Sequence, residues 1–259
     1  MVISVDPEWW KTLFDEVYLL TDARSVCDAA VTGKEVDLVL ALIPLLPHHR
    51  LLDLCGGHGR HVLELCSRGL EHCVLVDYSR VLVRRAKMES LSRRLPLSCL
   101  VADARRTGLL SRSFDRILIM GNSLGYLRDS EADLEILREC HRLLRSEGRL
   151  LVDLADGESV KKRFNPEAWH EIGEDILVCR RREMHERSVS VRELVVSKRK
   201  GLIRDRSYSI RFYEKKSAEK LLAGAGFEQI EITTDFSPHV EAGDHGFMDC
   251  RMIVVGRKP

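Results

Sequence analysis

Short apolar runs alternate with stretches of helical spacing along most of this 259-residue chain. Leu51, Leu52 and Leu54 are apolar on both faces, which is typical of a central parallel strand. Similar runs recur downstream and alternate with amphipathic stretches, a pattern that favours an α/β fold. The pattern predicts strands at 72–76, 97–101, 114–120, 148–154, 227–234 and 247–256. It also predicts helices at 33–46, 61–68, 79–93 and 134–144, and a last helix that begins at an N-cap, Ser217.

Two regions depart from this alternation. Residues 7–20 carry apolar side chains at helical spacing and predict one amphipathic helix, in which Trp9 and Trp10 either cover a sheet edge or close over a ligand. After residue 170, shorter alternating segments predict three antiparallel strands at 176–182, 188–196 and 202–213. We therefore expect an N-terminal helical lid (1–32), a core (33–168), an antiparallel β insertion (169–213) and the C-terminal part of the core (214–259).

A glycine-rich turn follows the first strand, at Cys55-Gly56-Gly57-His58-Gly59-Arg60. Glycines allow a sharp turn and a close approach of the backbone to a ligand. The next helix directs its N-terminus, with its free N–H groups, at that ligand. A dinucleotide fingerprint would need a further glycine at position 62, which is Val62. The turn therefore argues against a nicotinamide-dependent oxidoreductase.

Acidic residues stand at the ends of three successive strands. Asp53 ends the first and Asp103 follows the third, while Asp77 ends the second, 18 residues after Gly59. An acid at that spacing can bind ribose hydroxyls. The alternative interpretation of Asp77 is a turn residue that caps the following helix.

These residues resemble the motifs of class I S-adenosylmethionine-dependent methyltransferases. Asp53-x-x-Gly56-Gly57-x-Gly59 resembles the first motif, although Cys55 stands where that family usually has a glycine. Phe114-Asp115 and the loop 121–126 resemble the fourth motif. The resemblance spans about residues 30–256. It implies a Rossmann-like doubly wound sheet of seven strands, mostly parallel with an antiparallel last strand, beside the small β insertion.

The resemblance also implies a cofactor, S-adenosylmethionine, with S-adenosylhomocysteine as its product, and a role for each motif. The turn at the first strand would hold the methionine part, the second strand's end would hold ribose and adenine, and the third strand's end would bind the adenine edge. The residues implied are Asp53, Cys55, Gly57, His58, Gly59, Arg60, Asp77, Tyr78, Asp103, Ala104 and Asn122.

The methyl acceptor is less defined by the sequence. The family includes many small-molecule enzymes with lids, and Tyr18, Arg24, Arg211 and Tyr213 are candidate lid or substrate residues. A general base is needed only for a protonated acceptor, and the candidates chosen are His245 and Tyr126. His239 and His170 are alternatives. A metal site is not expected, because the spacing in the His-containing loop 235–246 matches no known pattern.

Composition leaves two other functions open. The net charge is only +1, but residues 180–216 hold 13 Lys or Arg against 5 Asp or Glu. This basic segment is either a solvated sheet face or a surface for an anionic substrate or RNA. The alternatives to a small-molecule methyltransferase are an RNA methyltransferase and a non-catalytic binding module. Without a signal-peptide pattern, a C-x-x-C pair or a long apolar run, we expect a cytoplasmic protein.

Overall fold

The largest element of the computed structural model, which describes residues 2–22, 27–239, 247, 249 and 251–259, is a seven-stranded sheet. Its spatial order is β10-β11-β5-β4-β1-β2-β3, and only β11 runs antiparallel to its neighbours. This confirms the doubly wound sheet with an antiparallel last strand. The strands are β1 (Arg50–Leu54), β2 (His72–Asp77), β3 (Leu97–Val101), β4 (Phe114–Ile119), β5 (Leu144–Ala155), β10 (Glu228–Phe236) and β11 (Arg251–Arg257).

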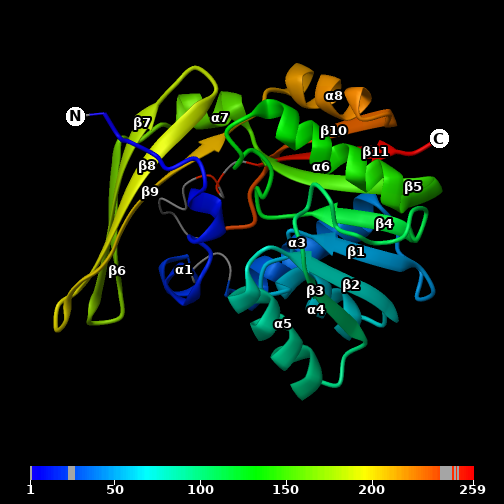
Figure 1. Cartoon of the computed structure of the whole chain (residues 1–259), viewed down its shortest axis with the longest axis horizontal. Helices are drawn as coiled ribbons and strands as arrows, with labels where there is room; N and C mark the ends of the chain where they lie inside the picture. Colours follow the sequence, from blue (N-terminus) through cyan, green and yellow to red (C-terminus); the bar gives the residue numbers. More distant parts are fainter. Residues whose placement is uncertain (1, 23–26, 240–246, 248, 250) are drawn as a thin grey trace.

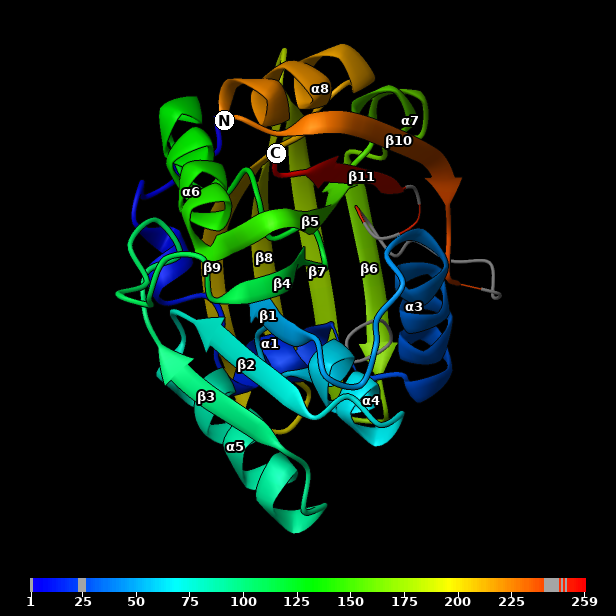
Figure 2. The ribbon, with the colours of Figure 1, turned by 90° about the vertical axis from the view of Figure 1, so that its right-hand side faces the viewer.

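Helices cover both faces of this sheet (Figure 2). α3 (Ala29–Leu42), α4 (Arg60–Ser67) and α5 (Arg80–Ser92) pack on one face through Val39, Val62 and Ala86. α6 (Ser130–Leu143) and α8 (Lys215–Gly224) pack on the other through Leu137 and Leu222. Because both faces are covered, the central strands are apolar on both sides, as the sequence pattern requires.

A second sheet of four antiparallel strands stands beside the first (Figure 1). It follows the short helix α7 (Gly157–Lys162) and consists of β6 (Glu167–Ile172), β7 (Ile176–Met184), β8 (Ser188–Ser197) and β9 (Gly201–Arg211). The sequence predicted only three of these strands. β6 was missed because it is an edge strand whose largest apolar side chain, Trp169, is 71% exposed. Half-buried and exposed residues alternate along β6, but each side mixes apolar and polar residues, so the sequence shows no alternation of residue type.

The predicted N-terminal helix over residues 7–20 is wrong. The segment forms a 3₁₀ turn, η1 (Trp9–Lys11), and a separate helix, α1 (Glu16–Thr21). Asp15 adopts an extended backbone conformation and its carboxylate accepts hydrogen bonds from the amides of Val17 and Tyr18. An N-cap at Asp15 starts a new helix at this point, so a continuous helix is interrupted there.

Other boundaries differ by a few residues for similar reasons. α8 begins at Lys215, and Ser217 is not its N-cap but the third helical residue, which completes a capping box with Glu214. α6 begins earlier than predicted because Asp129 caps it. Ser79 is confirmed as the N-cap of α5, where its hydroxyl accepts the amide N–H of Leu82.

The N-terminal segment lies between the two sheets (Figure 1). The ring of Trp9 packs 5.2 Å from that of Tyr126, which follows β4, and 5.5 Å from that of Tyr208 on β9. The hydroxyl of Ser79 donates to the carbonyl of Phe14. These contacts connect both sheets to one short segment. Among the described residues no helix is long and apolar enough to cross a membrane.

Candidate functional site

One cavity of about 210 Å³ opens between the two sheets, at the carboxyl ends of the parallel strands. Such an edge is where open α/β sheets bind ligands. The cavity is lined by the turns that follow β1, β2, β3 and β4, by the N-terminal segment, and by β7, β8 and β9 of the second sheet. Trp9 and Trp10 both line it, so they cover a cavity rather than a sheet edge.

The glycine turn after β1 forms one wall of the cavity. Cys55 adopts a left-handed conformation with φ of 59°, and Gly57 does so with φ of 58°. A side chain at Gly56 would place its Cβ 2.7 Å from Cγ of Asp53, so only glycine fits there. Cys55, Gly57 and His58, which the resemblance assigns to the cofactor, line the cavity. The left-handed backbone explains why glycine suits position 55, where this chain has a cysteine.

Asp53 and Gly59 lie behind this wall and do not contact the cavity in the described structure. The would-be Cβ of Gly59 lies 3.0 Å from Leu75 and 3.1 Å from Ala86, so this glycine allows α4 to pack closely on β2 and α5. Asp53 is fully buried beneath the turn. Burial, opposed by the charge of Arg60, raises the pKa of Asp53 to about 7.

Asp77 ends β2 and fastens the glycine turn. One of its carboxylate oxygens accepts the amide N–H of Gly57 at 2.8 Å, and the other accepts that of Ser79 at 2.8 Å. Asp77 is therefore a turn residue, but the cap of α5 is Ser79 and not Asp77. Asp77 still lines the cavity, and a carboxylate can accept about four hydrogen bonds, so capacity remains for ribose hydroxyls.

Tyr78, Asp103 and Ala104 also line the cavity, near the ends of β2 and β3. The ring of Tyr78 packs edge-on against Trp10, with centroids 4.7 Å apart. The carboxylate of Asp103 pairs with the guanidinium of Arg105 at 2.6 Å, and this hydrogen bond lowers the pKa of Asp103. Aromatic rings beside an ionised carboxylate are surroundings that suit a purine.

Arg60 stands at the first position of α4, and its side chain lines the cavity. Its Nη1 bonds to Thr32 and to Glu35, whereas its Nη2 is buried without a hydrogen-bond partner among the described residues. A buried guanidinium nitrogen without a partner fits a carboxylate ligand. The three parts of S-adenosylmethionine thus have candidate partners in the cavity. Arg60 suits its carboxylate, Asp77 its ribose, and the surroundings of Tyr78 and Asp103 its adenine.

Asn122 and Tyr126 come from the loop after β4, and both line the cavity. The amide oxygen of Asn122 accepts the backbone N–H of Ala155 at 2.7 Å, which fixes the loop against the end of β5. Tyr126 stacks on Phe14 with ring centroids 5.4 Å apart. Burial raises the pKa of Tyr126 well above its usual value, so its phenol is protonated near neutral pH.

The candidate lid residues have different positions. Tyr18 lines the cavity, whereas Arg24 and His245 lie outside the described residues. Arg211 and Tyr213 do not line it: both bond to the carboxylate of Asp133 on α6. The structure thus gives them an anchoring contact at the end of β9, away from the expected lid position.

The second sheet contributes charged residues that the sequence analysis did not single out. Arg180, Arg182, Glu193 and Arg204 line the cavity, and each is nearly buried. They alternate with outward-facing charges such as Arg192, and alternation is the signal that could have identified them. The basic segment is therefore not only a solvated face, because three of its arginines face the cavity.

Known proteins resemble this chain over most of its length. Residues 51–148 match the family model described as a methyltransferase domain. A protein of Bacillus subtilis (strain 168) named "Putative methyltransferase YqeM" is 26% identical over 192 residues, which cover 73% of this chain and 77% of that protein.

Solved structures share the fold. An S-adenosylmethionine-dependent methyltransferase from Clostridium acetobutylicum ATCC 824 superposes with a TM-score of 0.74 at 17% identity, covering 94% of this chain and 98% of that one. The sugar N-methyltransferase KedS8 from Streptoalloteichus sp ATCC 53650 superposes with a TM-score of 0.69 at 21% identity, covering 100% and 96%. With the motifs and the cavity, these comparisons show that the chain is similar to S-adenosylmethionine-dependent methyltransferases and shares their fold.

Proposed function

We propose that this enzyme methylates a small molecule held between the glycine turn and the inner face of the second sheet. The observation that carries the proposal is the shared cavity: one space is lined both by the cofactor motifs and by residues of η1, α1, β7, β8 and β9. An acceptor bound there would be surrounded by protein. The fold of a sugar N-methyltransferase is similar, which is compatible with this proposal but does not identify the acceptor.

We assign the cofactor to the end formed by the parallel strands. Arg60 would bind its carboxylate, Asp77 its ribose, and Tyr78, Asp103 and Ala104 its adenine, while the amides of the glycine turn lie along it. Asp53 would act from beneath the turn as a buried negative charge near the cofactor's ammonium group. The bound cofactor supplies a methyl group activated by a sulfonium, so the protein's task is to align the acceptor and exclude water.

The acceptor end combines aromatic and charged surfaces. Phe14, Tyr18, Tyr126 and Tyr208 provide aromatic walls, and the N-terminal segment over them would exclude water. Tyr126, protonated near neutral pH, would hold the acceptor by its hydroxyl rather than remove a proton from it. We assign no general base, since His245 lies outside the described residues.

Arg204 suggests what the acceptor offers. Its Nη1 is buried, lies 3.6 Å from a carboxylate oxygen of Glu193, and makes no hydrogen bond to a described residue. A buried N–H donor without an acceptor favours a ligand that brings an oxygen, such as a hydroxyl, carboxylate or phosphate. The proposed acceptor therefore has an apolar or ring-shaped body with an oxygen-bearing group near β9.

The directions in which the arginines of the second sheet point disfavour RNA as the methyl acceptor. Arg180, Arg182 and Arg204 line the cavity between the sheets, whereas the outward-facing Arg181 and Arg192 are paired with Glu183 and Asp205. An RNA surface needs open, unneutralised charge.

The proposal is tested with methyl-labelled S-adenosylmethionine. The enzyme is incubated separately with a metabolite fraction below about 1 kDa, with total RNA and with protein, all from its source. We expect label in the metabolite fraction, which mass spectrometry would then resolve. Label in RNA or protein alone would overturn the small-molecule assignment while leaving the cofactor assignment intact.

A further inference from the structure

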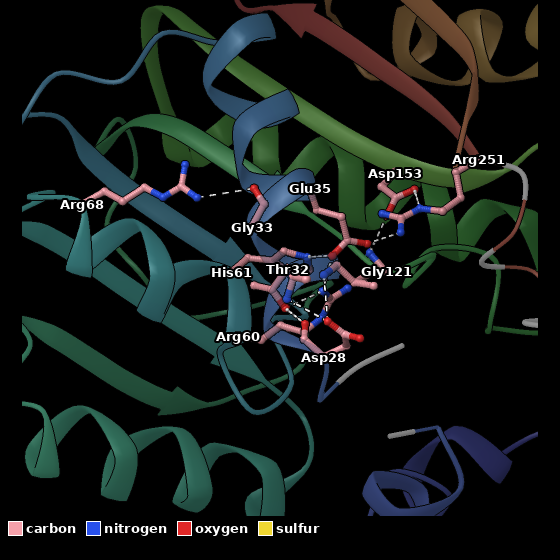
Figure 3. Close-up of polar contacts among 12 residues, drawn as sticks. Asp28, Thr32, Gly33, Glu35, Arg60, His61, Arg68, Gly121, Asp153 and Arg251 are labelled. Atoms are coloured by element: carbon pink, nitrogen blue, oxygen red, sulfur yellow. Dashed lines mark hydrogen bonds and ion pairs between the residues drawn. The ribbon is translucent and has the colours of Figure 1, made fainter. Parts of the chain in front are cut away.

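A row of buried charges links the two walls of the cofactor end, although none of its central members contacts the cavity (Figure 3). Glu35 on α3 bonds to Arg60 through Oε2 and to Arg251 on β11 through Oε1. Arg251 bonds in turn to both oxygens of Asp153 on β5. Asp153 accepts the backbone N–H of Gly121, which follows β4, at 2.7 Å.

The order of charges in this row is regular. Arg60, Glu35, Arg251 and Asp153 alternate in sign, and the side chains of the last three are 0% exposed. Burial alone would raise the pKa of Glu35, but the charge of Arg251, the hydrogen bond from His61 and the charge of Arg60 hold it below its usual value. Glu35 is therefore ionised, and it forms an ion pair with one guanidinium on each side.

Such a row is costly to bury, and hydrophobic residues of similar volume often stabilise a fold at least as well. Stability alone therefore does not account for it. Both ends of the row lie on the cavity: Arg60 with its unpaired Nη2, and Gly121 with its backbone. The central residues come from α3, β5 and β11, which belong to distant parts of the chain.

We propose that Glu35, Arg251 and Asp153 are positioning residues for the cofactor's amino-acid end. They hold the guanidinium of Arg60 and the loop at Gly121 at a fixed separation without touching the ligand. This inference rests on the proposed role of Arg60 as the partner of the cofactor's carboxylate. Glu35 is the key member because its two oxygens bind different arginines, and its bond to Nη1 of Arg60 leaves Nη2 as the nitrogen without a partner among the described residues.

The test compares two ligands by calorimetry on the full-length protein: S-adenosylhomocysteine and its analogue without the α-carboxyl group. For the unchanged protein we expect the analogue to bind about tenfold more weakly, as for loss of a hydrogen bond to a charged group. In Glu35→Gln the two ligands should bind with similar affinity, as in Arg60→Met. The double variant should be no weaker than Arg60→Met alone, because the two residues act as one unit.

A merely structural role for Glu35 would weaken both ligands equally and leave their ratio unchanged, which would overturn the inference. If Arg60→Met keeps the tenfold ratio, the proposed role of Arg60 fails instead, so the two failures are distinguishable. Should Glu35→Gln not fold, Glu35→Asp preserves the charge but is one methylene too short to reach both arginines. It should lower the ratio in the same way, and an unchanged ratio would count against the proposal.

Discussion

The backbone N–H of Gly57 donates a hydrogen bond to one carboxylate oxygen of Asp77, 2.8 Å away, so the end of β2 fastens the turn that follows β1. The other oxygen accepts the N–H of Ser79. One side chain thus shapes the turn, bonds to the N-cap residue of α5 and lines the cavity. In the proposed cofactor site, Asp77 would act in two ways: by contact with the ligand and by fixing the adjoining backbone.

Asp77→Ala should therefore weaken binding of S-adenosylhomocysteine by more than tenfold, through loss of the ribose acceptor and of the fastened turn. Asp77→Asn keeps one acceptor oxygen but places an N–H₂ group opposite a backbone N–H, so an intermediate loss is expected. Calorimetry measures the affinities. Thermal unfolding measures the loss of stability that comes from the turn, and so separates it from the loss of the ribose contact. Unchanged affinity in both variants would exclude Asp77 from the cofactor site.

Cys55 should tolerate glycine but not valine. Its left-handed backbone suits glycine and disfavours a β-branched side chain, with strain of about 1–3 kcal/mol. We expect Cys55→Gly to bind S-adenosylhomocysteine within about twofold of the parent protein. Cys55→Val should unfold at a lower temperature and bind at least fivefold more weakly. Equal behaviour of the two variants would show that this backbone conformation does not shape the site.

Asp53→Asn should stabilise the protein without ligand above pH 7. An unfolded aspartate titrates near pH 3.9, whereas folded Asp53 titrates at about 7. Between these values the folded state binds the extra proton, so its stability falls as pH rises. Urea unfolding at pH 8 should show the variant more stable by about 2 kcal/mol, with a smaller difference at pH 5.

The difference between the two proteins is the relevant quantity, because His61 titrates in an overlapping range. Burial and the charge of Arg60 lower the pKa of His61 to about 4, so stability is lost as pH falls from about 6.5 towards 4. That trend is common to both proteins and cancels in the comparison. A stability difference that does not change with pH would contradict the assignment.

Arg204→Met should impair acceptor binding without affecting the cofactor. Once an acceptor is known, we expect its KM to rise about tenfold while the affinity for S-adenosylhomocysteine stays within twofold. Arg192→Met is the matched control: Arg192 lies on the same sheet, faces outward and pairs with Asp205. Equal changes in KM for both variants would indicate a general effect on the sheet rather than contact with the acceptor.

The sequence determined the main architecture because its signals are local. Apolar runs such as Leu51–Leu54 are the direct consequence of burial on both faces of a parallel sheet. The glycine turn and Asp77 were identified from residue type and spacing, because each ends a strand in a known order. The edge strand β6 was missed because its side chains are not buried on either face strongly enough to leave a pattern.

Tertiary structure alone decided which charges face the cavity and which support it. Arg180 and Arg204 come from different strands, and their partners Asp22 and Asp15 come from the N-terminal segment, over 150 residues away. Glu35, Asp153 and Arg251 are ordinary charged residues in the sequence, and they meet only because α3, β5 and β11 pack together. Contacts between distant segments leave no local periodicity, so the sequence specified the cofactor turn, while the fold specified what surrounds it.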